Sequence, residues 1–204
     1  MRPLIKVGLL TFSMLFFTSQ SMAQGTSIGL KGGGTLYQGV IEFMNVEETA
    51  DAVFAFGGGL FMEMPLNRFV SVQPELLFMM KATEINDLFG IGGSYNNTFS
   101  YIDVPFLLRV NIDVLDGLTP YVMGGPFAGY LLKAESEYGG STEDITDDFE
   151  SINFGAKIGG GFQFGALSLE VMYEMGLMNI LDEDEGGELS AKLNGLSLML
   201  GISF

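Results

Sequence analysis

The stretch SINFGAKIGGGFQF, residues 151–164, decides the fold because large apolar side chains recur at every second position. Phe154 and Phe162 share one face of an extended chain, whereas Asn153 and Lys157 share the other. Alternation with a period of two is typical of a β-strand that has one apolar and one polar face.

The same alternation recurs along the chain and predicts about eight strands. The segments lie at 26–38, 52–64, 69–82, 98–112, 119–133, 151–164 and 167–176, and in a last strand that ends at Phe204. Each has about 10–14 residues, which is long enough for a tilted strand to cross a bilayer.

The connections between these segments alternate in length. Short turns are expected at 65–68, 113–118 and 165–166. Long polar loops are expected near 39–51, 83–97, 134–150 and 177–191. An outer-membrane barrel has short periplasmic turns and long outer loops, so the rhythm favours that class.

The chemistry of the two faces distinguishes a membrane barrel from a soluble one. Phe54 and Phe56 lie on one face of their segment, while Gly57, Gly59 and Glu63 lie on the other. A soluble lipocalin-like carrier would turn the apolar face inward and leave the charges outside, whereas a membrane barrel does the reverse. We predict an all-β fold, a closed antiparallel up-and-down transmembrane β-barrel of about eight strands, and keep the secreted carrier as the alternative.

Charged residues on the inner face are expected to pair, because unpaired charges in a narrow lumen would be costly. The two-residue turn at Gly165-Ala166 fixes one hairpin register, which places Lys157 opposite Glu174 and Gly161 opposite Glu170.

A second register is chosen to pair charges on the third and fourth strands. It places Glu75 opposite Arg109, Lys81 opposite Asp103 and Gln73 opposite Asn111, with Phe78 facing Phe106 and Leu76 facing Leu108 outside. The candidate site is therefore a lumenal ion-pair network that fills the barrel and fixes its register. It comprises Glu75, Arg109, Lys81, Asp103, Lys157 and Glu174.

The N-terminus has the layout of a secretory signal peptide. Arg2 and Lys6 precede an apolar run at 7–18, and Ser21-Met22-Ala23 supplies small residues for cleavage. We expect residues 1–23 to be removed and residues 24–204 to form the barrel domain; an uncleaved membrane anchor is the alternative.

Composition excludes several function classes. The 204 residues contain no Cys and no His, which excludes disulfides, thiol nucleophiles and His-based catalytic or zinc sites. The formal net charge of −16 argues against nucleic-acid binding. We expect no catalytic residue, no cofactor and no metal site.

Acidic residues gather in the expected outer loops, notably at 143–150 and 182–185. Carboxylates are ligands for hard divalent cations, but neither cluster has the spacing of an EF-hand loop. Solvated, self-repelling loops are the favoured interpretation, and divalent cation binding is the alternative.

Four motifs resemble those of the PorT-like outer-membrane β-barrel domain family, among the small eight-stranded barrels of the OmpX and OmpA type. The most specific is Tyr101-Ile102-Asp103-Val104-Pro105 followed by Leu107-Leu108-Arg109. The looser ones are the Gln73-Pro74-Glu75-Leu76-Leu77 strand, residues 121–126 and the aromatic C-terminal strand Leu200–Phe204. The resemblance implies an outer-membrane barrel without catalytic residues, and some members belong to secretion or gliding machinery.

We therefore expect a non-enzymatic integral protein of the bacterial outer membrane with a plugged lumen and acidic outer loops. A small pore, a transport or secretion component, and less readily an outer-membrane enzyme are the alternatives. Expected partners are outer-membrane lipid and lipopolysaccharide, the assembly machinery through the strand ending in Phe204, and an unidentified protein.

Overall fold

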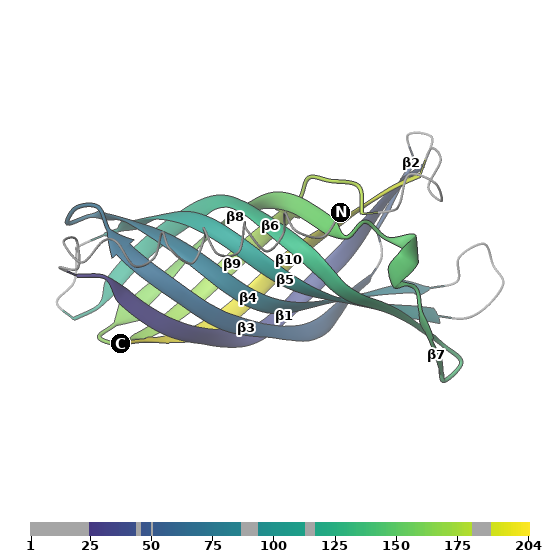
Figure 1. Cartoon of the computed structure of the whole chain (residues 1–204), viewed down its shortest axis with the longest axis horizontal. Helices are drawn as coiled ribbons and strands as arrows, with labels where there is room; N and C mark the ends of the chain where they lie inside the picture. Colours follow the sequence, from purple (N-terminus) through teal and green to yellow (C-terminus); the bar gives the residue numbers. More distant parts are fainter. Residues whose placement is uncertain (1–24, 44–45, 50, 87–93, 113–116, 181–188) are drawn as a thin grey trace, which may run out of the picture.

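Long antiparallel strands wind around a common axis and close into a barrel (Figure 1). The structure is a computed structural model that describes residues 25–43, 46–49, 51–86, 94–112, 117–180 and 189–204. The predicted signal peptide, residues 1–23, and the acidic cluster at 182–185 lie outside the described residues. Within the described part of the chain, no helix is both long and apolar enough to cross a membrane.

The elements are β1 (Ser27–Phe43), β2 (Val46–Thr49), β3 (Asp51–Pro65), β4 (Val70–Asn86), β5 (Ser94–Asn111), β6 (Thr119–Tyr138), β7 (Ser141–Asp144), the 3₁₀ turn η2 (Thr146–Asp148), β8 (Ile152–Phe164), β9 (Leu167–Gly176) and β10 (Leu189–Ser203). Eight of them form the wall in the order β1, β3, β4, β5, β6, β8, β9, β10. The barrel closes where β10 pairs with β1, from Gly29 opposite Ser203 to Phe43 opposite Leu189. The predicted barrel of about eight strands is thus confirmed.

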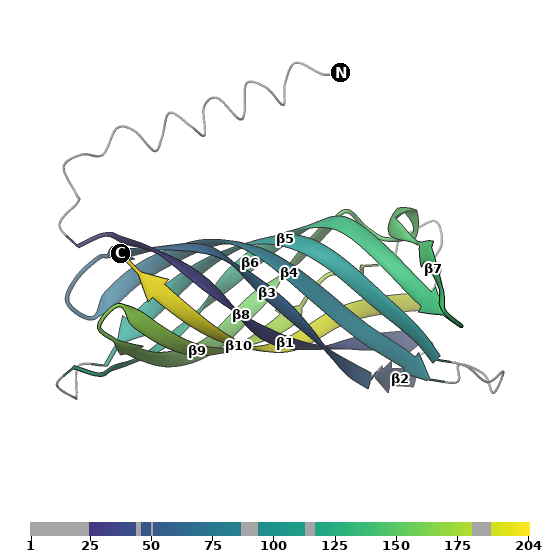
Figure 2. The same cartoon turned by 90° about the horizontal axis from the view of Figure 1, so that it is seen from below.

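The two ends of the barrel differ. The C-terminus lies at one end, and β2 and β7 extend the opposite end (Figures 1 and 2). At the C-terminal end, the Asn67 side chain accepts hydrogen bonds from the amides of Phe69 and Val70, which closes the turn between β3 and β4. Gly165, with a φ of 57°, allows the two-residue turn between β8 and β9.

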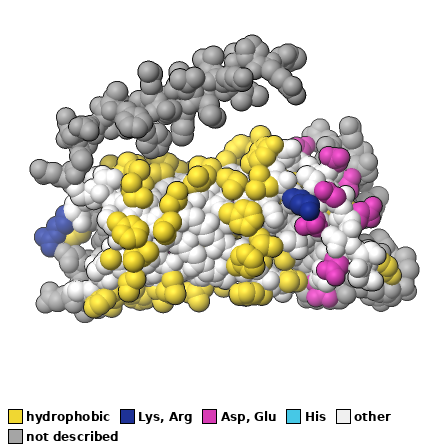
Figure 3. All heavy atoms as spheres, turned by 60° about the horizontal axis from the view of Figure 1, so that its bottom comes forward, with side chains coloured by type: hydrophobic (Ala, Val, Ile, Leu, Met, Phe, Trp, Pro, Cys, Tyr) yellow, Lys and Arg dark blue, Asp and Glu magenta, His cyan; other side chains and the backbone are white. Residues whose placement is uncertain are grey.

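The apolar face points outward and the charged face points inward, as expected for a membrane barrel. Phe54 is 70% exposed and Leu200 67% exposed, whereas Lys81 and Asp103 are 0% exposed. Hydrophobic side chains are spread along the wall, and acidic ones gather beyond them at the end that carries β7 (Figure 3). This sidedness excludes the alternative of a secreted carrier with an apolar interior.

Inward-facing glycines make room for large rings in the narrow lumen. A Cβ atom on Gly155 would collide with the ring of Phe127, and one on Gly195 would collide with the ring of Tyr37. These inward-facing glycines therefore serve lumen packing.

The register predicted for the β8–β9 hairpin is confirmed. Lys157 faces Glu174 and Gly161 faces Glu170. The two-residue turn leaves no freedom to slip, so the index of one pair determines all the others.

The register predicted for β4 and β5 is wrong by four residues. Arg109 faces Ser71 instead of Glu75, Asp103 faces Leu77 instead of Lys81, and Gln73 faces Leu107 instead of Asn111. The outward pairs change too, since Phe78 faces Ile102, Phe106 faces Pro74 and Leu108 faces Val72. The long connection between the strands imposes no register, and charges in a lumen also reach strands beyond the adjacent one. A slip by an even number keeps every side chain on its predicted face.

Several strands continue into segments predicted as loops. β1 extends to Phe43, β4 to Asn86 and β6 to Tyr138, while β7 pairs with the end of β6. Polar strands beyond the apolar band still satisfy their backbone groups by pairing, so a pattern based on apolar alternation ends too early.

Candidate functional site

Buried charged side chains occupy the lumen in three groups. They are called upper, middle and lower, with the upper group nearest the end that carries β7. Nine charged residues are buried in the described part of the chain, namely Lys31, Glu63, Glu75, Lys81, Asp103, Arg109, Lys157, Glu170 and Glu174. They come from β1, β3, β4, β5, β8 and β9, so the network joins strands on opposite sides of the ring.

The upper group contains two lysines and two carboxylates. Lys81 Nζ lies 2.6 Å from Glu174 Oε1 and 3.3 Å from Asp103 Oδ2. Lys157 Nζ lies 2.7 Å from Glu174 Oε2 and 3.1 Å from Asp103 Oδ2. Each ammonium group contacts both carboxylates, so the four charges balance and each removes part of the desolvation cost of the others.

Aromatic rings surround the most deeply buried of these cations. Lys81 Nζ lies 5.2 Å from the ring centre of Tyr37, 4.7 Å from that of Tyr101 and 5.1 Å from that of Phe127. The Tyr37 hydroxyl also donates a 2.8 Å hydrogen bond to Glu174. Ring faces attract cations, which helps to keep an ammonium group in a buried site.

The middle group contains one lysine and two carboxylates. Lys31 Nζ donates 2.7 Å hydrogen bonds to Glu75 and to Glu170. Gln73 adds a 2.6 Å hydrogen bond to Glu75. Lys31 therefore links β4 to β9 from the strand that closes the barrel.

The lower group is centred on Arg109, whose guanidinium group lies 3.1 Å from Glu63 and stacks 3.7 Å from the ring centre of Tyr121. Its Nε donates a 2.8 Å hydrogen bond to Asn111, and its NH2 donates to Gln163. Since guanidinium is planar and carries several donors, one side chain connects β3, β5 and β8.

All six residues of the predicted network are buried in the lumen. The structure brings together the pair Lys157–Glu174 and the pair Lys81–Asp103, the latter diagonally. It does not pair Glu75 with Arg109, because the register difference on β4 and β5 places Arg109 beside Glu63 and leaves Glu75 to Lys31.

Sequence reasoning missed Lys31, which has partners on β4 and β9. Lys31 follows the apolar Leu30 in a segment in which successive side chains alternate between the two faces, and this pattern indicates that the Lys31 side chain points inward. Glu63 and Glu170 were assigned to the inner face without a cationic partner, because hairpin arithmetic considers only adjacent strands.

An apolar cap closes the end of the barrel that carries β7. Phe149, which follows η2, meets Phe99 edge-to-face with ring centres 4.9 Å apart. Ile145 and Phe149 pack against a buried cluster that includes Ile180 and Leu131. Because Tyr37 and Tyr101 belong to the same cluster, the cap continues down to the rings around Lys81.

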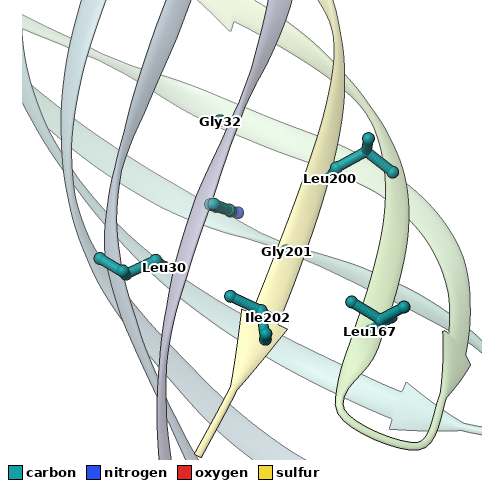
Figure 4. A pocket seen from close by; sticks show the side chains of 7 residues that line it. Leu30, Gly32, Leu167, Leu200, Gly201 and Ile202 are labelled. Carbon is teal, nitrogen blue, oxygen red and sulfur yellow. The ribbon is translucent and has the colours of Figure 1, made fainter.

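A groove on the outer wall is lined by Leu30, Gly32, Leu167, Leu200 and Ile202 (Figure 4). It spans β1, β10 and β9, where the barrel closes. Lys31 also borders it, but the Lys31 amine is engaged in the lumen by two carboxylates. The exposed lining is apolar, so the groove belongs to the face that contacts hydrocarbon.

The described acidic loop residues do not form a metal centre. Within the described ranges, no group of three or more His, Cys, Asp or Glu side chains is placed to hold a metal ion.

A closed barrel with an apolar exterior and a charged, filled lumen defines a transmembrane β-barrel protein. The chain belongs to the outer membrane protein beta-barrel domain family, whose model matches residues 18–182. The protein is therefore located in the outer membrane. No curated protein matches the chain.

Solved outer-membrane barrels have a similar fold. Neisserial surface protein A is 10% identical, with a TM-score of 0.50 over 89% of this chain and 100% of that one. The attachment invasion locus protein Ail of Yersinia pestis is 18% identical, with a TM-score of 0.43 over 88% of this chain and 97% of that one. The outer membrane enzyme PagL is 13% identical, with a TM-score of 0.44 over 82% and 98%. At these identities the likeness concerns the fold alone.

Proposed function

We propose that this protein is a non-enzymatic, non-conducting outer-membrane barrel that serves as a scaffold for its outer loops. The observation that carries this proposal is that three ionic groups cross the lumen one after another along the barrel. Lys31, Lys81 and Arg109 reach across the interior to bind carboxylates on other strands. A passing ion would have to displace contacts of 2.6–3.3 Å between buried charges.

The apolar cap adds a second obstacle above the ionic groups. Phe149 and Ile180 cover the end of the lumen with side chains that offer an ion no ligand. Both barriers support a closed barrel and oppose the alternative of a small pore.

Planar-bilayer recording tests the closed lumen. The barrel, refolded and inserted at increasing amounts, is expected to give no discrete conductance steps, while a wide porin inserted under the same conditions gives them. Reproducible steps that scale with the amount of this protein would overturn the proposal.

The enzyme alternative has a separate test. The chain contains no His, so a hydrolase of the His-dependent kind lacks its base. We expect the purified barrel to release no fatty acid from phospholipid or lipopolysaccharide in detergent micelles. Fatty acid release that persists after removal of trace contaminants, and that is lost when a single residue of the folded barrel is replaced, would contradict a non-enzymatic role.

We propose PorT-like membership and a partner in the outer membrane as the second candidate function. The Tyr101–Arg109 motif favours it, because this is the most specific of the segments that resemble that family. Cross-linking from the outer loops in intact outer membranes is expected to capture one dominant protein if the barrel is a secretion component. Labelling of lipopolysaccharide alone would favour a scaffold that contacts lipid only.

We also propose that the assembly machinery reads the C-terminal strand. Phe204 is 77% exposed, and its amide donates a 2.8 Å hydrogen bond to Ile28 at the closure of the barrel. Removing Phe204 is expected to lower insertion into outer membranes without preventing refolding of the purified chain into micelles. Equal insertion with and without Phe204 would contradict this role.

A further inference from the structure

The upper part of the lumen contains polar atoms that the described protein residues leave without a hydrogen bond. Asn153 is 0% exposed, and neither its Oδ1 nor its Nδ2 has a partner among the described residues. Asp103 Oδ1 is in the same situation, although Asp103 Oδ2 contacts two lysines. Buried amides and carboxylates without partners are costly, and ordered water commonly satisfies them.

These unpartnered atoms flank a single glycine. Asp103 on β5 faces Gly129 on β6, and Gly129 faces Asn153 on β8. A Cβ atom placed on Gly129 would lie 2.7 Å from Asp103 Oδ1 and 3.8 Å from the Asn153 Cβ. Because Gly129 has no side chain, the Asp103 carboxylate comes close to its backbone on one side, and the inward-facing Asn153 lies on the other. The gap that matters is the one between Asp103 Oδ1 and the Asn153 amide, which are not hydrogen-bonded to each other.

From this geometry, we propose that a structural water molecule binds beside Gly129 and bridges Asp103 Oδ1 to the Asn153 amide. The water donates one hydrogen to Asp103 Oδ1 and accepts one from Asn153 Nδ2, which leaves its second hydrogen for another acceptor such as Asn153 Oδ1. Two to four polar partners are what a buried water requires.

The charges around the gap decide the class of ligand. Lys81 and Lys157 lie 3.3 and 3.1 Å from the other oxygen of Asp103, so a metal cation in the gap would meet two ammonium groups. An anion would meet the Asp103 carboxylate. A neutral molecule that both donates and accepts avoids both repulsions, and water is the smallest such molecule.

Solution NMR of the isotopically labelled full barrel in micelles tests the site through magnetisation transfer from water to side-chain amides. We expect a transfer signal at the Asn153 side-chain amide that is several-fold stronger than at the Gln73 side-chain amide. Gln73 is a matched control because it is also buried, and it donates directly to Glu75, which contacts Lys31. Transfer relayed through exchanging lysine protons would affect both amides alike.

A second measurement uses Gly129→Ala, whose methyl group would lie 2.7 Å from Asp103 Oδ1 and would therefore push this oxygen out of the position in which it binds the water. In the folded variant, the Asn153 signal is expected to fall to the level of Gln73. The comparison within the unaltered protein does not depend on this variant. Signals that are equal at Asn153 and Gln73, or absent from both, would overturn the proposal. So would a high-resolution crystal structure in which Asn153 contacts Asp103 directly.

Discussion

Glu170 and Glu174 lie four residues apart on β9, and both are buried in the lumen, but their cationic partners differ. Glu174 contacts Lys81 and Lys157. Among the described cations, Glu170 forms an ion pair with Lys31 alone, which it shares with Glu75. Removing the charge of Glu174 leaves two lysines with one carboxylate. Removing that of Glu170 leaves one lysine with one carboxylate. Removing one negative charge therefore unbalances the charges of the group around Glu174, whereas it balances those of the group around Glu170.

We expect Glu174→Gln to lower the free energy of unfolding by about 3–5 kcal/mol, the usual cost of breaking a buried ion pair. Glu170→Gln is the same change of side chain on the same strand. It is expected to cost less than about 1 kcal/mol, because Lys31 still has the charged carboxylate of Glu75 as a partner. Urea unfolding of both variants in lipid vesicles gives the comparison. Equal losses, or a larger loss for Glu170→Gln, would show that local charge balance does not govern the network.

Residue by residue, the sequence was sufficient to assign faces and insufficient to assign partners. Lys81, Asp103, Arg109 and Lys157 alternate with apolar neighbours, so their inward direction follows from the period of a strand. Their partners depend on which strands meet across the lumen. Lys31 shows the limit, because its carboxylates are on β4 and β9 and no local pattern relates those strands.

At the scale of single elements, the strands differ in how far their sequences fix the register. β8 and β9 are joined by two residues, so the prediction of Lys157 opposite Glu174 had one solution and was confirmed. β4 and β5 are joined by a long segment, so maximising adjacent charge pairs was a poor criterion and gave a four-residue error. When the loop is long, the register of a strand pair is determined by its pairing with the neighbouring strands and by the closure of the barrel.

Gly155 on the inner face and Gly32 on the outer face are expected to respond differently to an added methyl group. A Cβ on Gly155 would collide with the Phe127 ring and with backbone of β9, whereas the nearest atom to a Cβ on Gly32 lies at 3.5 Å. We expect Gly155→Ala to destabilise the barrel by about 1–3 kcal/mol through overpacking. Gly32→Ala, which faces lipid, is expected to be neutral or slightly stabilising. Thermal unfolding in micelles compares them, and similar melting temperatures would contradict the packing role of inward glycines.

The β6–β7 hairpin outside the apolar band contains a titratable contact. The Thr146 hydroxyl donates a 2.6 Å hydrogen bond to Asp144, and the Thr146 amide donates one of 3.0 Å, which lowers the pKa of Asp144 below its ordinary 3.8. Ala134 on β6 donates its amide to the same hydroxyl. Because the folded pKa is the lower one, this support for the hairpin is present above about pH 4 and is lost as the pH falls through the folded pKa.

Carboxyl NMR titration is expected to give Asp144 a midpoint below 3.8 in the unaltered protein. In Thr146→Val, which removes the hydroxyl and keeps the shape of the side chain, the Asp144 midpoint is expected to rise. An identical Asp144 midpoint in both proteins would show that the hydroxyl contact does not order this hairpin in solution.

For the whole molecule, two barriers of different chemistry lie in series along one axis. The ionic groups hold the strands together across the lumen, and the apolar cap covers the β7 end above them. The ionic groups and the apolar cap share only one set of contacts among the described residues. The rings of Tyr37 and Tyr101 belong to the apolar cluster and also lie over Lys81. Barriers in series block conduction as long as one remains.

We therefore expect Phe149→Ala to leave the barrel non-conducting, since the lysines and carboxylates below the cap stay in place. Replacing Lys81 and Glu174 together by alanine keeps the charges of Lys157 and Asp103 balanced, and it is expected to leave the cap closed. Because the groups centred on Lys31 and Arg109 still occupy the lumen below, the triple variant, Phe149→Ala with both alanines, is also expected to give no discrete conductance steps in a planar bilayer. Refolding is checked by the resistance of each barrel to unfolding in detergent. Conduction by Phe149→Ala alone would mean that the ionic groups do not block the lumen, and the cap alone would then account for closure.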